Sequence, residues 1–203
     1  YADAESKVAY IRVSQFNDKT ADEIKKVLTQ LEADQAKGLI IDLRDNPGGL
    51  LNKCIEVCDL FLSSGDIVST QDRNKKGRSW SAKNDKFYFE EGKIPIAILI
   101  NRQSASASEI VSAALQDNNR ATIIGERTWG KGSVQRVIKL SSDPPTALKL
   151  TTDTYWRPGG KNIHRHNGMD ENAEWGVKPS EGFEVILKDD EKVAYARYRR
   201  NLD

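Results

Sequence analysis

Histidine and cysteine are both scarce, with two of each among the 203 residues. A histidine base for catalysis would have to be His164 or His166, which lie two residues apart in a polar stretch. Cys54 and Cys58 are spaced for one face of a helix, where a disulfide is geometrically poor and two thiols alone do not form a zinc site. We therefore expect buried core cysteines, and histidines in a solvated loop rather than in a metal site.

Long apolar runs, a strong net charge and a signal peptide are also missing. No apolar run approaches the length of a transmembrane helix, and the chain opens at Tyr1 on polar residues. The net charge is +1, which implies neither nucleic acid nor an anionic membrane as a partner. Apolar residues make up 38% and charged residues 30%, as in a globular chain, so we expect residues 1–203 to form one domain.

Strand and helix patterns alternate through the first 126 residues, and the part after Lys131 is mostly strand-like. The first helical pattern has Thr20 or Asp22 as its expected cap. Repeated β-α-β units followed by a β-rich part predict an α/β domain with a layered sheet. The expected helices are 19–35, 50–62, 105–118 and 189–202; the expected strands are 8–14, 38–44, 66–70, 94–100, 121–126, 133–140, 147–156 and 183–188; 71–92 is expected to be a loop or hairpin, and 157–176 a surface loop or active-site rim.

The two most apolar strands, 38–44 and 94–100, each end at an unusual turn. Catalytic and binding groups favour the carboxyl ends of strands in α/β sheets. The first turn, Asn46-Pro47-Gly48-Gly49, could aim bare backbone amides at one point, as an oxyanion hole requires. It could equally be a plain turn before a helix.

The second turn, residues 101–110, carries Ser104, Ser106 and Ser108 and no glycine. Ser106 and Glu109 have the spacing of a capping box, which is a purely structural explanation. The position also suits a nucleophile, because a serine at a helix N-terminus is held rigidly and the helix dipole favours negative charge beside it. Residues two apart on a helix point in different directions, so at most one of the three serines can face a given site.

Residues 125–135, GERTWGKGSVQ, nearly match the phosphate-binding P-loop G-x-x-x-x-G-K-[ST]. Gly132 stands where the P-loop has serine or threonine, and a strand pattern follows where a P-loop opens a helix. Nucleotide binding is therefore a poor explanation. Lys131 suits another role, because a desolvated lysine loses its proton near neutral pH and can deprotonate a serine without histidine.

Several blocks of the sequence together resemble the C-terminal processing proteases, also called tail-specific proteases. The blocks are GLIIDLRDNPGGLL (38–51), SASASEIVSAALQDNNRATIIGERTWGKGSVQ (104–135), the Tyr-x-x-Pro-x-Gly segment 155–160 and WGVKPS (175–180). The resemblance covers nearly the whole chain. It implies a Ser-Lys endopeptidase with a core like those of Clp protease and crotonase, which needs no cofactor or metal. It also implies protein or peptide substrates with accessible C-termini, and a location outside the cytoplasm.

The same resemblance assigns roles to individual residues. The implied catalytic residues are Ser106 as nucleophile, Lys131 as its base and Gln135 as the residue that orients the lysine. The implied oxyanion donors are the amides of Ala107 and of Gly48 or Gly49. Because residues four apart on a strand share a face, we expect Lys131 and Gln135 to meet.

The sequence departs from the family pattern in three ways. Gln103 stands where the family has a small residue, and Ser180 stands where it has aspartate. Residue 1 falls about where the family's PDZ domain would end, so we expect an isolated and weakly active core in which Ser106 and Lys131 lie beyond hydrogen-bond reach. The alternative is a non-catalytic module that grips peptide ends, although the retained serine, lysine and Gln135 argue against it.

Overall fold

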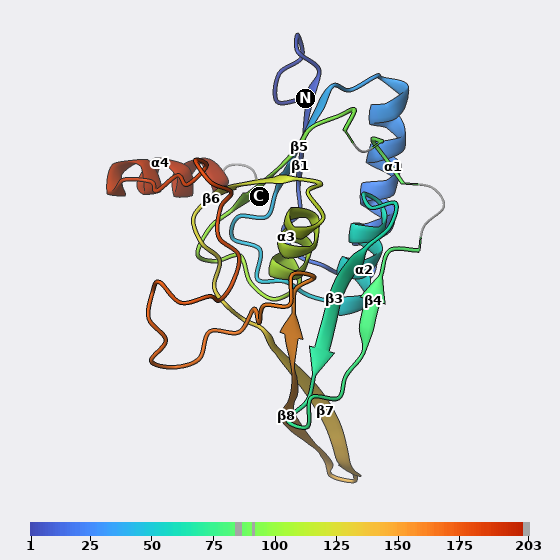
Figure 1. The fold of residues 1–203 in the computed structure, drawn as a ribbon, viewed down its shortest axis with the longest axis vertical. Coiled ribbons are helices and arrows are strands. Elements are labelled where there is room, and N and C mark those ends of the chain that lie inside the picture. The colour runs from blue at the N-terminus through green and yellow to red at the C-terminus, as the bar shows by residue number, and fades with distance from the viewer. Residues whose placement is uncertain (84–86, 91, 201–203) are drawn as a thin grey trace.

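The computed structural model describes residues 1–83, 87–90 and 92–200, and it contains two four-stranded sheets (Figure 1). The first sheet is parallel, with the strand order β1-β2-β5-β6. Its register places Ile11, Ile41, Ile98 and Ile123 in one row across the sheet. The strands of this sheet are β1 (Val8–Arg12), β2 (Gly38–Asp42), β5 (Ile96–Ile100) and β6 (Thr122–Gly125).

Three helices connect and cover the strands of the parallel sheet: α1 (Thr20–Ala33), α2 (Leu51–Asp59) and α3 (Ala107–Asp117). Helix α2 packs between α1 and α3. Cys54 and Cys58 on α2 are free and fully buried, which confirms their prediction as core residues. None of the helices in the described part of the chain is long and apolar enough to cross a membrane.

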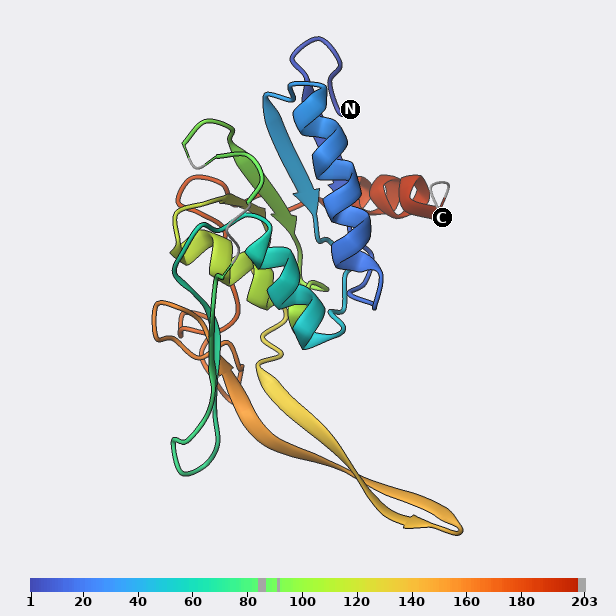
Figure 2. The same cartoon turned by 90° about the vertical axis from the view of Figure 1, so that its right-hand side faces the viewer.

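The second sheet is antiparallel, with the order β4-β3-β8-β7. Helix α3 contacts both β6 and β3, so it joins the two sheets. The β7–β8 hairpin projects far from the rest of the chain (Figure 2), and Val137 and Leu140 on it are 68% and 65% exposed. The strands are β3 (Asp66–Gln71), β4 (Ser79–Ser81), β7 (Ser133–Ser142) and β8 (Pro145–Trp156).

Most predicted elements are confirmed, and the exceptions have physical reasons. Residues 183–188 do not form a strand, because they pair with the sheet only at Gly125, the last residue of β6. The N-cap of α1 is Lys19 rather than Thr20 or Asp22, because the Thr20 hydroxyl donates instead to the Gln15 carbonyl.

The expected α/β fold with a β-rich C-terminal part is confirmed, and its strands form two sheets, since the hairpin pairs with β3 and not with β6. The expected loop or hairpin at 71–92 contains β4, which pairs with β3, while 84–86 and 91 lie outside the described residues. The closing helix α4 (Asp189–Arg200) is present, and residues 201 and 202 of its predicted range are likewise outside them.

Candidate active site

The carboxyl ends of the parallel strands lie at one edge of the sheet, and the two unusual turns meet there. Residues 43–49 follow β2 and residues 101–106 follow β5, its neighbour in the sheet. The Asn46 side chain is fully buried and donates to the Val13 carbonyl at 2.7 Å, which ties the first turn to the end of β1. The Ala105 N–H donates to the Asn46 carbonyl at 3.0 Å, which ties the two turns together.

The three serines of the second turn have separate environments. Ser104 and Ser108 are fully buried, and their hydroxyls donate to the carbonyls of Leu43 and Asn46, at 2.7 Å and 3.0 Å. Only Ser106 is partly exposed. Two of the hydroxyls therefore fasten this turn to the first one, and the third is accessible to another molecule.

Ser106 caps a helix and is also partly exposed to solvent. It is the N-cap residue of α3 and forms the predicted capping box with Glu109, whose Oε2 accepts from the Ser106 N–H at 2.8 Å. Its φ of 58° and ψ of −115° are unusual for a residue with a side chain, and such conformations cost about 1–3 kcal/mol and cluster at functional sites. The capping and nucleophile explanations for this serine are thus compatible.

The two glycines proposed for an oxyanion hole have different neighbours in the structure. A Cβ at Gly48 would lie 2.7 Å from Ser106 Cβ and 2.8 Å from the Ala107 nitrogen, so these residues are in close contact. A Cβ at Gly49 would instead lie 2.0 Å from the Phe16 carbonyl oxygen. Gly48 is therefore the glycine beside Ser106. Its N–H already donates to Asn46 Oδ1 at 2.8 Å.

A buried carboxylate links the serine turn to the lysine turn. Glu109 Oε1 accepts from the Thr128 hydroxyl at 2.6 Å and from the Gly130 N–H at 2.7 Å. Its Oε2 accepts from the N–H groups of Ser106 and Lys131, both at 2.8 Å. Burial raises the pKa of Glu109, and the four donors oppose that rise only in part.

Glu109 is the site residue whose role the sequence did not indicate in full. Its spacing from Ser106 predicted the capping box, but nothing in the pattern pointed to contacts with residues 128–131. Those contacts depend on how β6 returns to α3, which is a property of the tertiary fold.

Lys131 and Gln135 are both exposed. Among the described residues, no hydrogen bond joins the side chains of Lys131, Gln135 and Ser106. The predicted meeting of the lysine and glutamine assumed one regular strand. However, β7 begins only at Ser133, and its register shifts between Val134 and Gln135, so the alternation of faces does not extend from one to the other.

The loop with the two histidines packs directly on the lysine turn. The Arg165 N–H donates to the Gly130 carbonyl at 2.9 Å, and a Cβ at Gly132 would lie 2.3 Å from the His164 nitrogen. The rings of His164 and His166 are in edge contact, with centroids 4.8 Å apart, and burial and this neighbour lower the pKa of His164. Residues 157–176 form a loop, as predicted, but His164 is only partly exposed within it because it packs on the lysine turn.

A cleft of about 970 Å³ lies beside the lysine turn. Thr128, Trp129 and Gly130 line it together with the loop that carries His164, but Ser106 and Lys131 do not. Trp129 is 62% exposed at its rim. The cleft is therefore next to the serine site rather than part of it.

Comparisons with known proteins agree with the sequence resemblance. The profile of Peptidase family S41 matches residues 7–179. A carboxy-terminal-processing protease from Bartonella bacilliformis is 46% identical over 164 residues, which are 78% of this chain and 37% of that protein. A carboxyl-terminal-processing protease from Synechocystis is 40% identical over 180 residues, which are 89% of this chain and 39% of that protein.

The architecture also has a counterpart among solved structures. The photosystem II D1 C-terminal processing protease superposes with a TM-score of 0.75 and is 32% identical, over 87% of this chain and 42% of that one. The chain thus spans well under half the length of these relatives.

Proposed function

The chain belongs to peptidase family S41, and we propose that it is the proteolytic core of a serine endopeptidase that cleaves proteins near their C-termini. The observation that carries the proposal is the position of Ser106. It is the one partly exposed serine of its turn, at the N-terminus of α3, with Gly48 and the Ala107 amide beside it.

In the proposed first step, Ser106 Oγ attacks the scissile carbonyl and Lys131, in its neutral form, takes the hydroxyl proton. The carbonyl oxygen becomes an oxyanion, which the amides of Ala107 and Gly48 stabilise, the latter exchanging its bond to Asn46 for the oxyanion. The lysine then gives the proton to the leaving amine, and an acyl-enzyme remains. Water attacks the acyl group in a second cycle, with the lysine again as base.

Lys131 and Gln135 are both exposed, so in this proposal the bound substrate completes the part of the site that they form. A bound substrate strand would cover both side chains and exclude water from them. Gln135 would then orient the amine. The proposed substrates are proteins or peptides with an accessible C-terminus. A relative from Tetradesmus obliquus is named as chloroplastic, which supports a proposed location outside the cytoplasm.

The proposal is tested by incubating the chain and its Ser106→Ala variant with an unfolded protein and mapping the fragments by mass spectrometry. Fragments with new C-termini near the original end are expected from the wild type alone. Cleavage that survives the substitution contradicts the assignment of the nucleophile.

A peptide-binding module without cleavage is the second candidate. The lack of a hydrogen bond between Ser106 and Lys131 in the described chain favours it. It predicts that the wild type binds a labelled peptide and leaves it intact.

A further inference from the structure

Helix α4 rests on the rest of the chain through a small polar contact. Tyr195 and Arg199 lie one helical turn apart, and so on the same face. Arg199 is 6% exposed, whereas Val193 and Tyr198 are each 60% exposed. A cleft of about 830 Å³ lies between α4 and the ends of β5 and β6. The helix is therefore held mainly by the polar side chains of this face.

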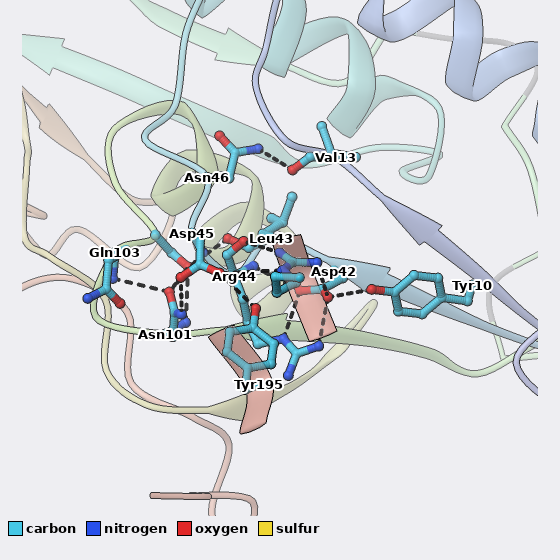
Figure 3. A network of polar contacts seen from close by, with 12 residues as sticks. Tyr10, Val13, Asp42, Leu43, Arg44, Asp45, Asn46, Asn101, Gln103 and Tyr195 are labelled. Atoms are coloured by element: carbon cyan, nitrogen blue, oxygen red, sulfur yellow. Dashed lines mark hydrogen bonds and ion pairs between the residues drawn. The ribbon is translucent and has the colours of Figure 1, made fainter. Parts of the chain in front are cut away.

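These side chains contact the residues directly after β2. Arg199 Nη1 lies 3.3 Å from Asp42 Oδ2, and its Nη2 donates to the Arg44 carbonyl at 2.8 Å. Its Nε lies 3.5 Å from Asp45 Oδ2, and the Tyr195 hydroxyl donates to that same oxygen at 2.7 Å (Figure 3). One face of α4 thus contacts the backbone and the carboxylates of a single turn.

The contacted residue Asp45 also binds the serine turn. Its Oδ1 accepts from Asn101 Nδ2 at 2.7 Å, and its N–H donates to Asn101 Oδ1 at 3.0 Å (Figure 3). Asp45 has a φ of 61°, which is uncommon for residues other than glycine, although aspartate tolerates it better than most. Tyr195 and Arg199 supply part of the contacts around this residue.

Asn46, the next residue in the chain, connects Asp45 to the proposed oxyanion site through hydrogen bonds. Asn46 Oδ1 accepts the Gly48 N–H, and the Asn46 carbonyl accepts the Ala105 N–H and the Ser108 hydroxyl. We therefore expect a shift of Asp45 to displace both Gly48, which lies against Ser106, and the serine turn itself.

We propose that α4 is a positioning element, in which Tyr195 and Arg199 hold residues 43–49 so that Gly48 stays beside Ser106. The inference rests on the proposed function and deepens it. Neither Tyr195 nor Arg199 touches the reacting atoms. Their role is to keep an oxyanion donor within the short distance that transition-state stabilisation requires.

Loss of Arg199 should leave the fold intact. Asp42 would still accept from Arg44 Nε and Nη2, at 2.9 Å and 2.8 Å, and from the Tyr10 hydroxyl at 2.5 Å (Figure 3). The buried carboxylate thus keeps a cationic partner. What the variant loses is the ion pair with Asp42, the bond to the Arg44 carbonyl and the contact with Asp45.

The experiment compares Arg199→Gln and Tyr195→Phe with matched changes on the exposed side of the same helix, Arg197→Gln and Tyr198→Phe. For Arg199→Gln we expect kcat to fall by about 10- to 100-fold with KM changed by less than about 3-fold, since displacement of a catalytic group by about 1 Å has an effect of this size. Tyr195→Phe should cause a smaller loss. Arg199→Lys should restore part of kcat, and both controls should behave as wild type.

Hydrogen exchange of residues 43–49 supplies a readout that does not depend on cleavage. We expect faster exchange there in Arg199→Gln than in Arg197→Gln, with exchange in α1 unchanged. An unchanged kcat in Arg199→Gln overturns the inference, and so does unchanged exchange at 43–49. If the wild type itself does not cleave, the proposed function fails, and exchange alone decides whether α4 holds the turn.

Discussion

The backbone N–H groups of Ser106 and Lys131 donate to one carboxylate oxygen, Glu109 Oε2, at 2.8 Å each. The proposed nucleophile and the proposed base are therefore aligned through their main chains, while their side chains make no hydrogen bond with each other in the described part of the structure. A carboxylate suits this position because both of its oxygens only accept, and all four of its partners donate.

Replacing this carboxylate by an amide should disturb both turns. In Glu109→Gln the amide NH2 would face either the Ser106 and Lys131 amides or the Thr128 hydroxyl and the Gly130 amide. We expect the free energy of unfolding to fall by about 1–3 kcal/mol, as for other buried polar groups left unpaired, together with a loss of cleavage. Urea unfolding measures the first effect. Glu90→Gln, at an exposed ion pair with Lys93, is the control and should stay within about 0.5 kcal/mol of wild type.

Alanine substitutions of the three serines in the 101–110 turn should affect either cleavage or the free energy of unfolding, depending on the serine. Ser106→Ala should abolish peptide cleavage at a cost of at most about 1 kcal/mol for the helix cap. Ser104→Ala and Ser108→Ala should lower the free energy of unfolding by about 0.5–1.5 kcal/mol, because each removes one buried hydrogen bond to the neighbouring turn, whose Leu43 and Asn46 carbonyls keep their backbone donors. Both should still cleave below their melting temperatures. If Ser104→Ala abolished cleavage and Ser106→Ala did not, the nucleophile would be misassigned.

Gly48→Ala tests the predicted oxyanion donor. Gly48 has a φ of +99°, and the added methyl would lie 2.7 Å from Ser106 Cβ and 2.8 Å from the Ala107 nitrogen, so cleavage should be lost. Gly160→Ala is a matched control, since its φ is +75° and no atom lies within 4 Å of the new Cβ. It should carry only the backbone strain, about 1–2 kcal/mol, and keep its activity. Equal activity in the two variants would remove Gly48 from the site.

The histidines should be dispensable for the chemistry. With lysine as base, the rate of cleavage should rise with pH, and His164→Gln combined with His166→Gln should keep the shape of the pH–rate profile. His164 is packed on the lysine turn, so a uniform decrease in rate is compatible with the mechanism. Disappearance of the pH dependence in the double variant would point to a histidine base.

Acid stability should depend on Asp42. Burial by itself raises the pKa of this carboxyl, but the bonds from Arg44 and Tyr10 outweigh that effect and lower the pKa below its usual 3.8. The folded state thus holds its proton less tightly than the unfolded state. The resulting stabilisation is complete above the unfolded pKa and is lost as the pH falls through the folded pKa. In urea unfolding between about pH 5 and about pH 2, Asp42→Asn should therefore show a shallower loss of stability than wild type. An unchanged slope would contradict this account.

The sequence predicted most elements of the fold because their periodicities are strong. The continuous apolar runs 38–44 and 94–100 became the central strands β2 and β5, of which β2 is buried on both faces except at Ile40, while β5 alternates between buried and partly buried residues. The partition into two sheets was not predictable, since strand patterns do not specify partners. The segment 183–188 has a strand composition but reaches the sheet only at Gly125.

The site was predictable to the extent that local pattern and family resemblance specify it. Both indicated Ser106 at a helix start and Lys131 as a candidate base, and the resemblance alone supplied Gln135. The bond from Ser106 to Glu109 was predicted as a capping box, but the other three were not, because their donors lie 19 to 22 positions away. The contact of Arg199 with Asp42 spans even more of the chain, and one arginine among several in a helix gives no sign of its burial.

Ser106 and Lys131 take their positions from their own backbones and from Glu109, and neither side chain belongs to the buried core. Selection for a folded protein alone would therefore allow substitutions at these two positions, while it would conserve Ser104, Ser108 and Glu109. A single substitution could silence such a domain without making it a target for degradation. Stable but inactive descendants are thus a short evolutionary step away from this architecture.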